Sequence, residues 1–304
     1  MDVLVVRAGA LGDVLLLRRA VAALRRARHC VHLVAPSAPG PVLVGPGPAE
    51  VSRFTPLDGP RWAAWLGEGA AGNDLAEDLR ADAVVALTRS GDLLARLGQL
   101  APRVFQRDPS PPPASEASRW FAEPVRGLGC DPGPDPPVLE FTAPERERAR
   151  ELARRLPSRF LAVHPGSGST LKNWPADRFA ALARALAPGR RWLLVSGPAD
   201  EGSVARLRAV PGALVARDLP VRVLGALLAG GAVYVGNDSG VTHLAAAAGA
   251  PTLALFGPTD AETWAPVGPA VETISSPDGT MEGLDLTRVQ EAMEQLLSRA
   301  EQQE

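Results

Sequence analysis

Short apolar runs alternate with longer segments of helical periodicity, and this alternation constrains the fold of the 304-residue chain more than any other feature. Strands that are apolar along their whole length are buried on both faces, which is typical of parallel sheets covered by helices. We predict strands at 2–6, 31–35, 83–87, 103–105, 159–163, 191–195, 213–216, 232–236 and 252–255. We predict helices at 13–28, 175–187, 220–229, 241–249 and 284–300.

A proline- and glycine-rich stretch at 129–137 separates two sets of these strands and helices. Its sequence, Gly-Cys-Asp-Pro-Gly-Pro-Asp-Pro-Pro, is incompatible with a helix or a central strand. The two sets predict two doubly wound α/β domains, for which the chain is long enough. We place the first domain at 1–143 and the second at 144–283, followed by a separate helical segment at 284–304.

Composition argues against several classes of protein. No stretch approaches the roughly 18–20 uninterrupted apolar residues that span a membrane, and the first strand begins too early for a signal peptide. A net charge of −2 gives no indication of nucleic-acid binding. Cys30 and Cys130 do not suggest a disulfide framework, which favours a cytoplasmic location.

One lysine stands out in an arginine-rich chain. Of the 32 lysine and arginine residues only Lys172 is lysine, and asparagine is nearly as rare, occurring as Asn73, Asn173 and Asn237. A lysine that persists against such a bias indicates a position where a compact ammonium serves and a planar guanidinium does not. Chance is the alternative interpretation.

The segment from Asp238 to His243 is the strongest candidate site. A predicted strand leads into Asp238, Ser239 and Gly240, which lie at the start of the next predicted helix. Backbone N–H groups at a helix N-terminus bind anions, and His243 is about one turn further on. A structural histidine is the alternative for His243.

Three other segments follow predicted strands of the second half. The loop from His164 to Pro175 contains Ser167, Gly168 and Lys172, and its N–H groups and ammonium could hold phosphate. Glu201 could accept hydrogen bonds from ribose hydroxyls or could cap a helix. Thr259 and Asp260 could contact the same ligand, with helix capping equally open.

A glycine-rich turn, Arg7 to Asp13, follows the first predicted strand. Gly9 and Gly12 would let a ligand approach the backbone closely. Their Gly-x-x-Gly spacing is not the dinucleotide fingerprint, so a nicotinamide-dependent oxidoreductase is poorly supported. Asp13 is either an ordinary N-cap of the next helix or a general base at the carboxyl edge of the sheet.

These motifs together resemble those of the ADP-heptose:lipopolysaccharide heptosyltransferases, glycosyltransferase family 9. Their order and spacing match over nearly the whole chain, least well over 36–150. The resemblance implies a GT-B architecture, in which two Rossmann-like doubly wound parallel-sheet domains face each other across a cleft. The N-terminal domain would bind the acceptor and the C-terminal domain the ADP-sugar, and the C-terminal helix would pack back on the N-terminal domain.

The resemblance also implies inverting transfer without a metal ion or other cofactor. The donor would be an ADP-sugar and the acceptor a glycolipid of the lipopolysaccharide core or a similar molecule. Asp13 would deprotonate the acceptor hydroxyl, and Lys172 would bind the diphosphate and stabilise the departing ADP. The other matched residues would line the donor, with Ser167, Gly168, Ser239 and Gly240 at phosphate, Glu201 at ribose, Asp238 at a sugar hydroxyl and His243 behind the phosphate site.

Two features leave alternatives open. Members of the family often carry serine where this chain has Gly9, which also motivates a non-catalytic nucleotide-sugar-binding protein that keeps the fold. The basic run Arg18, Arg19, Arg25, Arg26 and Arg28 could meet an anionic lipid or the inner face of the membrane, or could be a solvated helix face.

Overall fold

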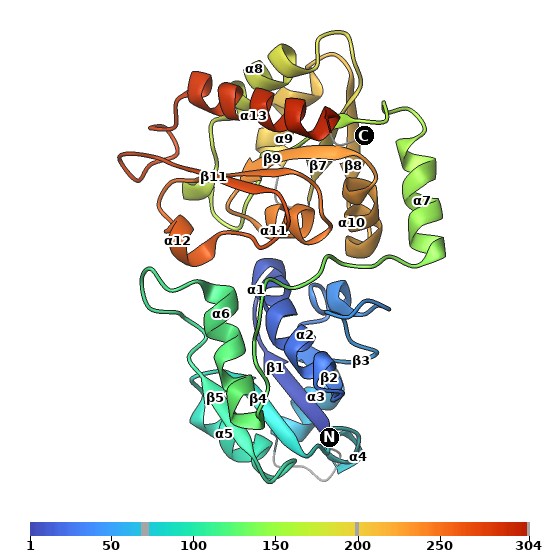
Figure 1. Cartoon of the computed structure of the whole chain (residues 1–304), viewed down its shortest axis with the longest axis vertical. Coiled ribbons are helices and arrows are strands. Elements are labelled where there is room, and N and C mark those ends of the chain that lie inside the picture. The colour runs from blue at the N-terminus through green and yellow to red at the C-terminus, as the bar shows by residue number, and fades with distance from the viewer. Residues whose placement is uncertain (68–72, 198–200, 303–304) are drawn as a thin grey trace. The chain divides into compact units, whose positions relative to one another are not determined.

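The computed structural model describes residues 1–67, 73–197 and 201–302, and the chain separates into two compact units, Met1–Glu140 and Phe141–Glu304 (Figure 1). Each unit contains a parallel sheet with helices on its faces. The prediction of two Rossmann-like α/β domains is therefore confirmed. The division, after Glu140, falls slightly before the predicted boundary at 143.

The sheet of the first unit has the strand order β3-β2-β1-β4-β5. Its strands are β1 (Asp2–Arg7), β2 (Cys30–Ala35), β3 (Arg53–Pro56), β4 (Ala83–Leu87) and β5 (Val104–Arg107). Its helices are α1 (Leu11–Leu16), α2 (Arg18–Arg26), η1 (Gly40–Leu43), α3 (Pro60–Leu66), α4 (Asn73–Asp78), α5 (Gly91–Leu97), α6 (Ala117–Ala122) and η3 (Glu123–Leu128). The helix predicted over 13–28 forms as α1 and α2, which meet at Leu17, where the backbone N–H bonds to Val14 in a tighter turn.

The sheet of the second unit has the strand order β11-β10-β9-β6-β7-β8. Its strands are β6 (Phe160–His164), β7 (Trp192–Ser196), β8 (Ala213–Arg217), β9 (Ala232–Asn237), β10 (Thr252–Phe256) and β11 (Val271–Ser275). Its helices are α7 (Ala143–Ala153), η4 (Thr170–Lys172), α8 (Ala176–Leu186), α9 (Glu201–Arg208), α10 (Val221–Ala229), α11 (Gly240–Ala247), α12 (Ala261–Trp264) and α13 (Leu286–Glu301).

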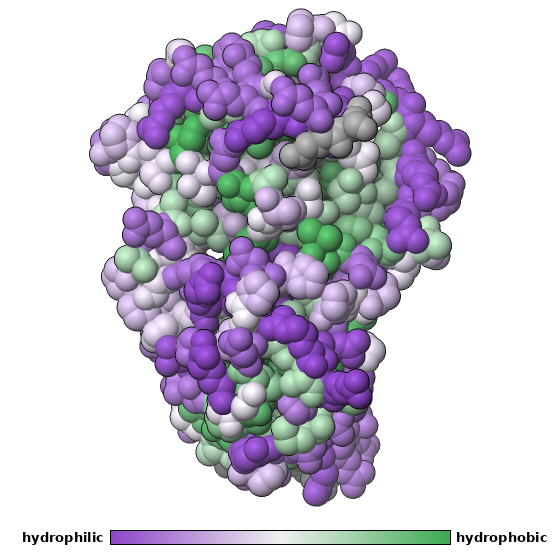
Figure 2. All heavy atoms as spheres, in the orientation of Figure 1, coloured by the Kyte–Doolittle hydropathy of each residue, from purple (hydrophilic) through white to green (hydrophobic). Residues whose placement is uncertain are grey.

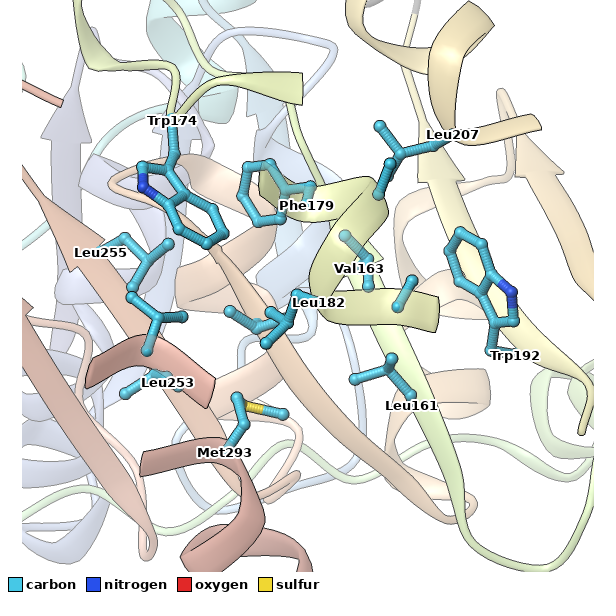
Figure 3. Close-up of a cluster of buried hydrophobic side chains, with 14 of the residues drawn as sticks. Leu161, Val163, Trp174, Phe179, Leu182, Trp192, Leu207, Leu253, Leu255 and Met293 are labelled. Carbon is cyan, nitrogen blue, oxygen red and sulfur yellow. The ribbon is translucent and has the colours of Figure 1, made fainter. Parts of the chain in front are cut away.

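The main core of the second unit lies between one face of its sheet and the helices α8, α9 and α13 (Figure 3). Alternate residues of the central strands point into it, because successive side chains of a strand face opposite sides. Trp174 and Phe179 meet edge to face with ring centroids 4.9 Å apart, and Trp192 is fully buried. This core fixes the strand ends that carry the candidate site.

α13 contributes to the core of the second unit, and its packing back on the first domain stays a sequence-based prediction. Val289, Met293, Leu296 and Ala300 form one buried stripe on the helix, and all four lie in the core of the second unit. The opposite face of α13 is hydrophilic (Figure 2). Among the described residues, no helix is long and apolar enough to cross a membrane.

Arginines of α2 bind the proline-rich stretch that the sequence identified as the domain break. Arg18 donates to the carbonyl oxygens of Pro136 and Pro137, Arg19 to that of Gly133, and Arg26 to those of Asp131 and Pro132. Prolines have no N–H, so these carbonyl groups find donors on side chains instead of in a helix or sheet. The stretch therefore stays with the first unit, and the division between units follows it.

The structure corrects the interpretation of the basic run at 18–28. Arg18 and Arg19 have 1% and 0% of their surface exposed, so neither a lipid-facing nor a solvated role holds for them. Arg25, Arg26 and Arg28 are exposed. Sequence periodicity identified the helix, but it gave no signal that two charged residues are paired inside the unit.

His32 makes the stability of the first unit sensitive to acid. Burial and the charge of Arg53 lower its pKa from 6.5 to about 4, and its Nε2 lies 2.9 Å from the Thr55 hydroxyl. The unfolded chain gains a proton near pH 6.5, whereas the folded chain does so only near pH 4. We expect the free energy of unfolding to fall by up to about 3 kcal/mol over this interval.

Urea unfolding at pH 7, 5.5 and 4 checks this prediction, with His32→Gln as the comparison. As the pH falls, the free energy of unfolding of the wild type should decrease more than that of the variant. The same difference at all three pH values would contradict the prediction.

Candidate functional site

Three of the four predicted ligand-binding segments of the second unit follow neighbouring strands and meet at their carboxyl ends. β9 lies between β10 and β6, with Asn237 opposite Leu255 and Gly236 opposite His164. The loops that follow these strands therefore start side by side. Open parallel sheets bind ligands at this edge.

Asp238 links all three loops. The Lys172 ammonium, from the loop after β6, donates to Oδ2 of Asp238 at 2.7 Å. The Thr259 hydroxyl, from the loop after β10, donates to the same oxygen at 2.8 Å. Asp238 has 10% of its side chain exposed and Lys172 33%, so the ion pair is partly desolvated but open to a ligand. The structure thus brings together Asp238 and Lys172 with Thr259, for which the sequence left ligand contact and helix capping open.

Ser239 is the N-cap of α11, and its side chain accepts from the Thr242 backbone N–H. The Thr242 hydroxyl donates to the carbonyl oxygen of Asn237 at 2.5 Å, so its oxygen accepts from Ser239 and Tyr234, each at 3.1 Å. Nδ1 of His164 lies 3.3 Å from the Ser239 hydroxyl. This network fixes the start of α11.

Gly240 is the first residue of α11, and His243 lies one turn further along it. The first amides of a helix have no carbonyl partner within the helix and carry the positive end of its dipole. His243 is buried, with 6% of its surface exposed. The predicted anion site therefore lies at the N-terminus of α11, with Asp238 immediately before the N-cap Ser239.

Asn237 holds the loop from His164 to Pro175 in place, and it was not among the predicted site residues. It is fully buried, accepts from the Trp174 backbone N–H at 3.0 Å and donates to the Pro165 carbonyl at 2.8 Å, which ties both ends of the loop to β9. Asn173 contributes to the same loop, because its Oδ1 accepts from the Ser167 hydroxyl at 2.7 Å. The rarity of asparagine in the sequence was the signal that could have found this pair.

Ser167 and Gly168 differ in how the loop uses them. The Ser167 hydroxyl is engaged within the loop, with Ser169 O at 2.6 Å, so its side chain shapes the turn. Gly168 is exposed, and a Cβ there would meet nothing within 4 Å. The fold itself therefore does not require glycine at 168.

The remaining predicted residues of the second unit have different outcomes. Glu201 begins α9, but its side chain lies outside the described residues. Asp260 is the N-cap of α12, accepting from the Glu262 N–H at 2.9 Å, so the capping alternative holds for it. Within the described residues, no group of three or more His, Cys, Asp or Glu side chains is placed to hold a metal ion.

In the first unit, Asp13 lies in the first turn of α1, after β1. Its Oδ2 accepts from the Ala10 backbone N–H at 2.9 Å, and its Oδ1 is 2.5 Å from Nη2 of Arg7. The Arg7 side chain is 8% exposed and its guanidinium stacks over Phe121, whereas 22% of the Asp13 side chain is exposed. The N-cap of α1 is Ala10, so Asp13 is not the N-cap; it accepts from the N-cap N–H as the third residue of the helix, and it remains accessible.

Gly9 and Gly12 both precede Asp13 in sequence. A Cβ at position 9 would lie 2.6 Å from Cβ of Asp13, so a serine there would require the Asp13 side chain to move. Glycine at position 9 thus leaves room for the Asp13 carboxylate to accept from the Ala10 N–H. Gly12 lies within α1.

The two Rossmann-like parallel-sheet units have the GT-B type of fold that solved heptosyltransferases share. A family model described as glycosyltransferase family 9 (heptosyltransferase) matches residues 100–293, and the chain belongs to this family. The family predicted from the motifs is therefore confirmed.

Individual relatives show how far the similarity extends. Lipopolysaccharide heptosyltransferase 3 of Escherichia coli is 31% identical over 115 residues, which cover 35% of this chain and 34% of that protein. A family 9 glycosyl transferase from Veillonella parvula superposes with a TM-score of 0.84 at 19% identity, over 98% of this chain and 97% of the other. E. coli heptosyltransferase WaaC, solved with ADP, superposes with a TM-score of 0.74 at 22% identity, over 97% of this chain and 100% of the other. WaaC was also solved with ADP-2-deoxy-2-fluoro heptose.

Proposed function

We propose that the chain transfers heptose or a related sugar from an ADP-sugar to a glycolipid of the lipopolysaccharide core or a similar acceptor. The observation that carries this proposal is the contact of Lys172 and Thr259 with Asp238, directly before the N-terminus of α11. The ADP and ADP-sugar analogue held by WaaC support the donor class. A cytoplasmic location, with contact to the inner membrane face, stays a sequence-based proposal.

The donor roles follow the chemistry of each group. The Lys172 ammonium and the amides of Ser239 and Gly240 supply positive potential for a diphosphate. Gly168, where the fold leaves room for a side chain, suits close approach of phosphate to the backbone. The proposed residues are completed by Ser167 and His243 beside phosphate, Glu201 at ribose and Asp238 at a sugar hydroxyl.

The proposed step is a direct displacement that inverts the anomeric carbon. The acceptor oxygen attacks this carbon while the bond from the carbon to the diphosphate oxygen breaks. Asp13 takes the proton of the acceptor hydroxyl, and the electron pair of the broken bond leaves with ADP. Lys172 and the helix amides stabilise that charge, so the proposal needs no metal ion.

A transfer assay tests this function. The full chain is incubated with ADP-heptose and a lipopolysaccharide-core glycolipid, and ADP release and the mass of the acceptor are followed together. We expect one sugar added per ADP released, with the opposite anomeric configuration, and the same rate with and without a chelator. Binding of ADP-sugar with no release of ADP would contradict catalysis.

A second function, a non-catalytic nucleotide-sugar-binding protein, is favoured by one observation. Both carboxylate oxygens of Asp13 are already engaged, one by Arg7 and one by the Ala10 amide. This function predicts ADP-sugar binding without turnover on any acceptor. The transfer assay and a binding titration together separate the two functions.

A further inference from the structure

The Asp238 carboxylate is held by two donors of different charge. Lys172 and Thr259 both donate to Oδ2, at 2.7 and 2.8 Å. In the described part of the chain, Oδ1 accepts no hydrogen bond and so has free lone pairs. One oxygen is thus fixed by the protein, and the other is available to a ligand hydroxyl.

Thr259 is itself held in place. It follows β10 and directly precedes Asp260, whose carboxylate accepts from the Glu262 N–H and the Thr263 hydroxyl at the start of α12. On the other side of the contact, the Asp238 backbone N–H bonds to the Leu255 carbonyl at 2.9 Å. The hydroxyl and the carboxylate are therefore both mounted on the rigid ends of neighbouring strands.

The two donors respond differently to an anionic ligand. A diphosphate beside Lys172 competes with Asp238 for the ammonium, and it also repels the carboxylate. The Thr259 hydroxyl is neutral and directional, so its hydrogen bond persists when the ammonium is shared. A hydrogen bond to a charged acceptor is stronger than one between neutral groups.

We propose that Thr259 is a positioning residue that keeps Asp238 oriented towards the donor sugar while Lys172 engages the diphosphate. This role rests on the proposed function and deepens it, because it assigns recognition of the sugar to a pair of residues. Thr259 acts through Asp238 and makes no contribution to binding of ADP itself. Its signature is a change in the ratio of ADP-sugar affinity to ADP affinity.

Calorimetric titration of the full chain with ADP and with ADP-heptose tests this role. Thr259→Val keeps the shape of the side chain and removes the hydroxyl, and we expect it to weaken ADP-heptose binding about 10-fold or more. ADP binding should stay within about twofold, because a lost bond to Asp238 does not touch the diphosphate site. Thr259→Ser keeps the hydroxyl and should recover most of the ADP-heptose affinity.

Thr252→Val is the matched control, since it removes a buried threonine hydroxyl that bonds to the Ala250 carbonyl at the opposite end of β10, away from Asp238. It should leave the ratio of the two affinities unchanged. Equal losses for Thr259→Val and Thr259→Ser, or a loss of ADP and ADP-heptose binding in parallel, would overturn the positioning role while the proposed function stands. If wild type bound neither ligand, the proposed function would fail and the role of Thr259 with it.

Discussion

Asp13→Asn is expected to lower kcat for sugar transfer by about 10²–10⁴-fold, the usual contribution of a positioned general base. Asparagine keeps the shape of the side chain and a carbonyl oxygen for the Ala10 N–H, but it cannot take a proton from an acceptor hydroxyl. Donor affinity should stay within about twofold, because the proposed donor residues all lie in the second unit. The transfer assay and a donor titration give the two values separately.

Two controls make the Asp13 experiment specific. Asp92→Asn changes an exposed carboxylate in the first turn of α5, in the same unit, and should leave kcat unchanged. Thermal unfolding of Asp13→Asn shows whether loss of the Arg7 partner has unfolded the first unit. A folded Asp13→Asn protein with wild-type kcat would show that Asp13 has a structural role at the helix start and is not the base.

Arg19→Met is expected to lower the free energy of unfolding by about 1–3 kcal/mol, because its loss leaves buried or partly buried hydrogen-bonding partners without their donor. The Arg19 side chain is fully buried and pairs with Glu116 and Asp135. It also donates to the Ser118 hydroxyl at 3.2 Å and to the Gly133 carbonyl at 2.9 Å. Its loss would leave the proline-rich stretch without one of its principal donors.

Arg25→Met is the matched control for Arg19, since Arg25 is exposed on the same helix. Its effect should be within about 0.5 kcal/mol, as for most surface substitutions. Urea unfolding at pH 7 measures both variants. A loss below about 1 kcal/mol in Arg19→Met would mean that the contacts of Arg19 with the proline-rich stretch contribute little to stability.

The central strands and the larger helices could be predicted because burial on both faces leaves a continuous apolar run. β3 and β11 could not, because both are edge strands with partly exposed residues and mixed sequences. The role of Arg18 and Arg19 was missed for a different reason. Their partners lie about a hundred residues away in sequence, so no local pattern connects them.

The candidate site was predicted as far as residue chemistry and strand ends allow. Asp238 and Lys172 were identified separately, but their direct contact depends on β9 lying next to β6, which periodicity does not specify. Asn237 was noted for the rarity of asparagine but was not assigned to the site, because its partners Trp174 and Pro165 are distant in sequence. The role of Thr259 was left open between ligand contact and helix capping. Its observed hydrogen bond to Asp238 is neither of these.

The most direct test of the donor site is calorimetric titration of the full chain with ADP-heptose, UDP-glucose and GDP-mannose, repeated with Lys172→Met. We expect ADP-heptose to bind most tightly to wild type and at least about 10-fold more weakly to Lys172→Met, since the variant loses a charged contact to diphosphate. Preference for a uridine or guanosine donor, or equal ADP-heptose affinity in Lys172→Met, would contradict an ADP-sugar site built around Lys172 and Asp238.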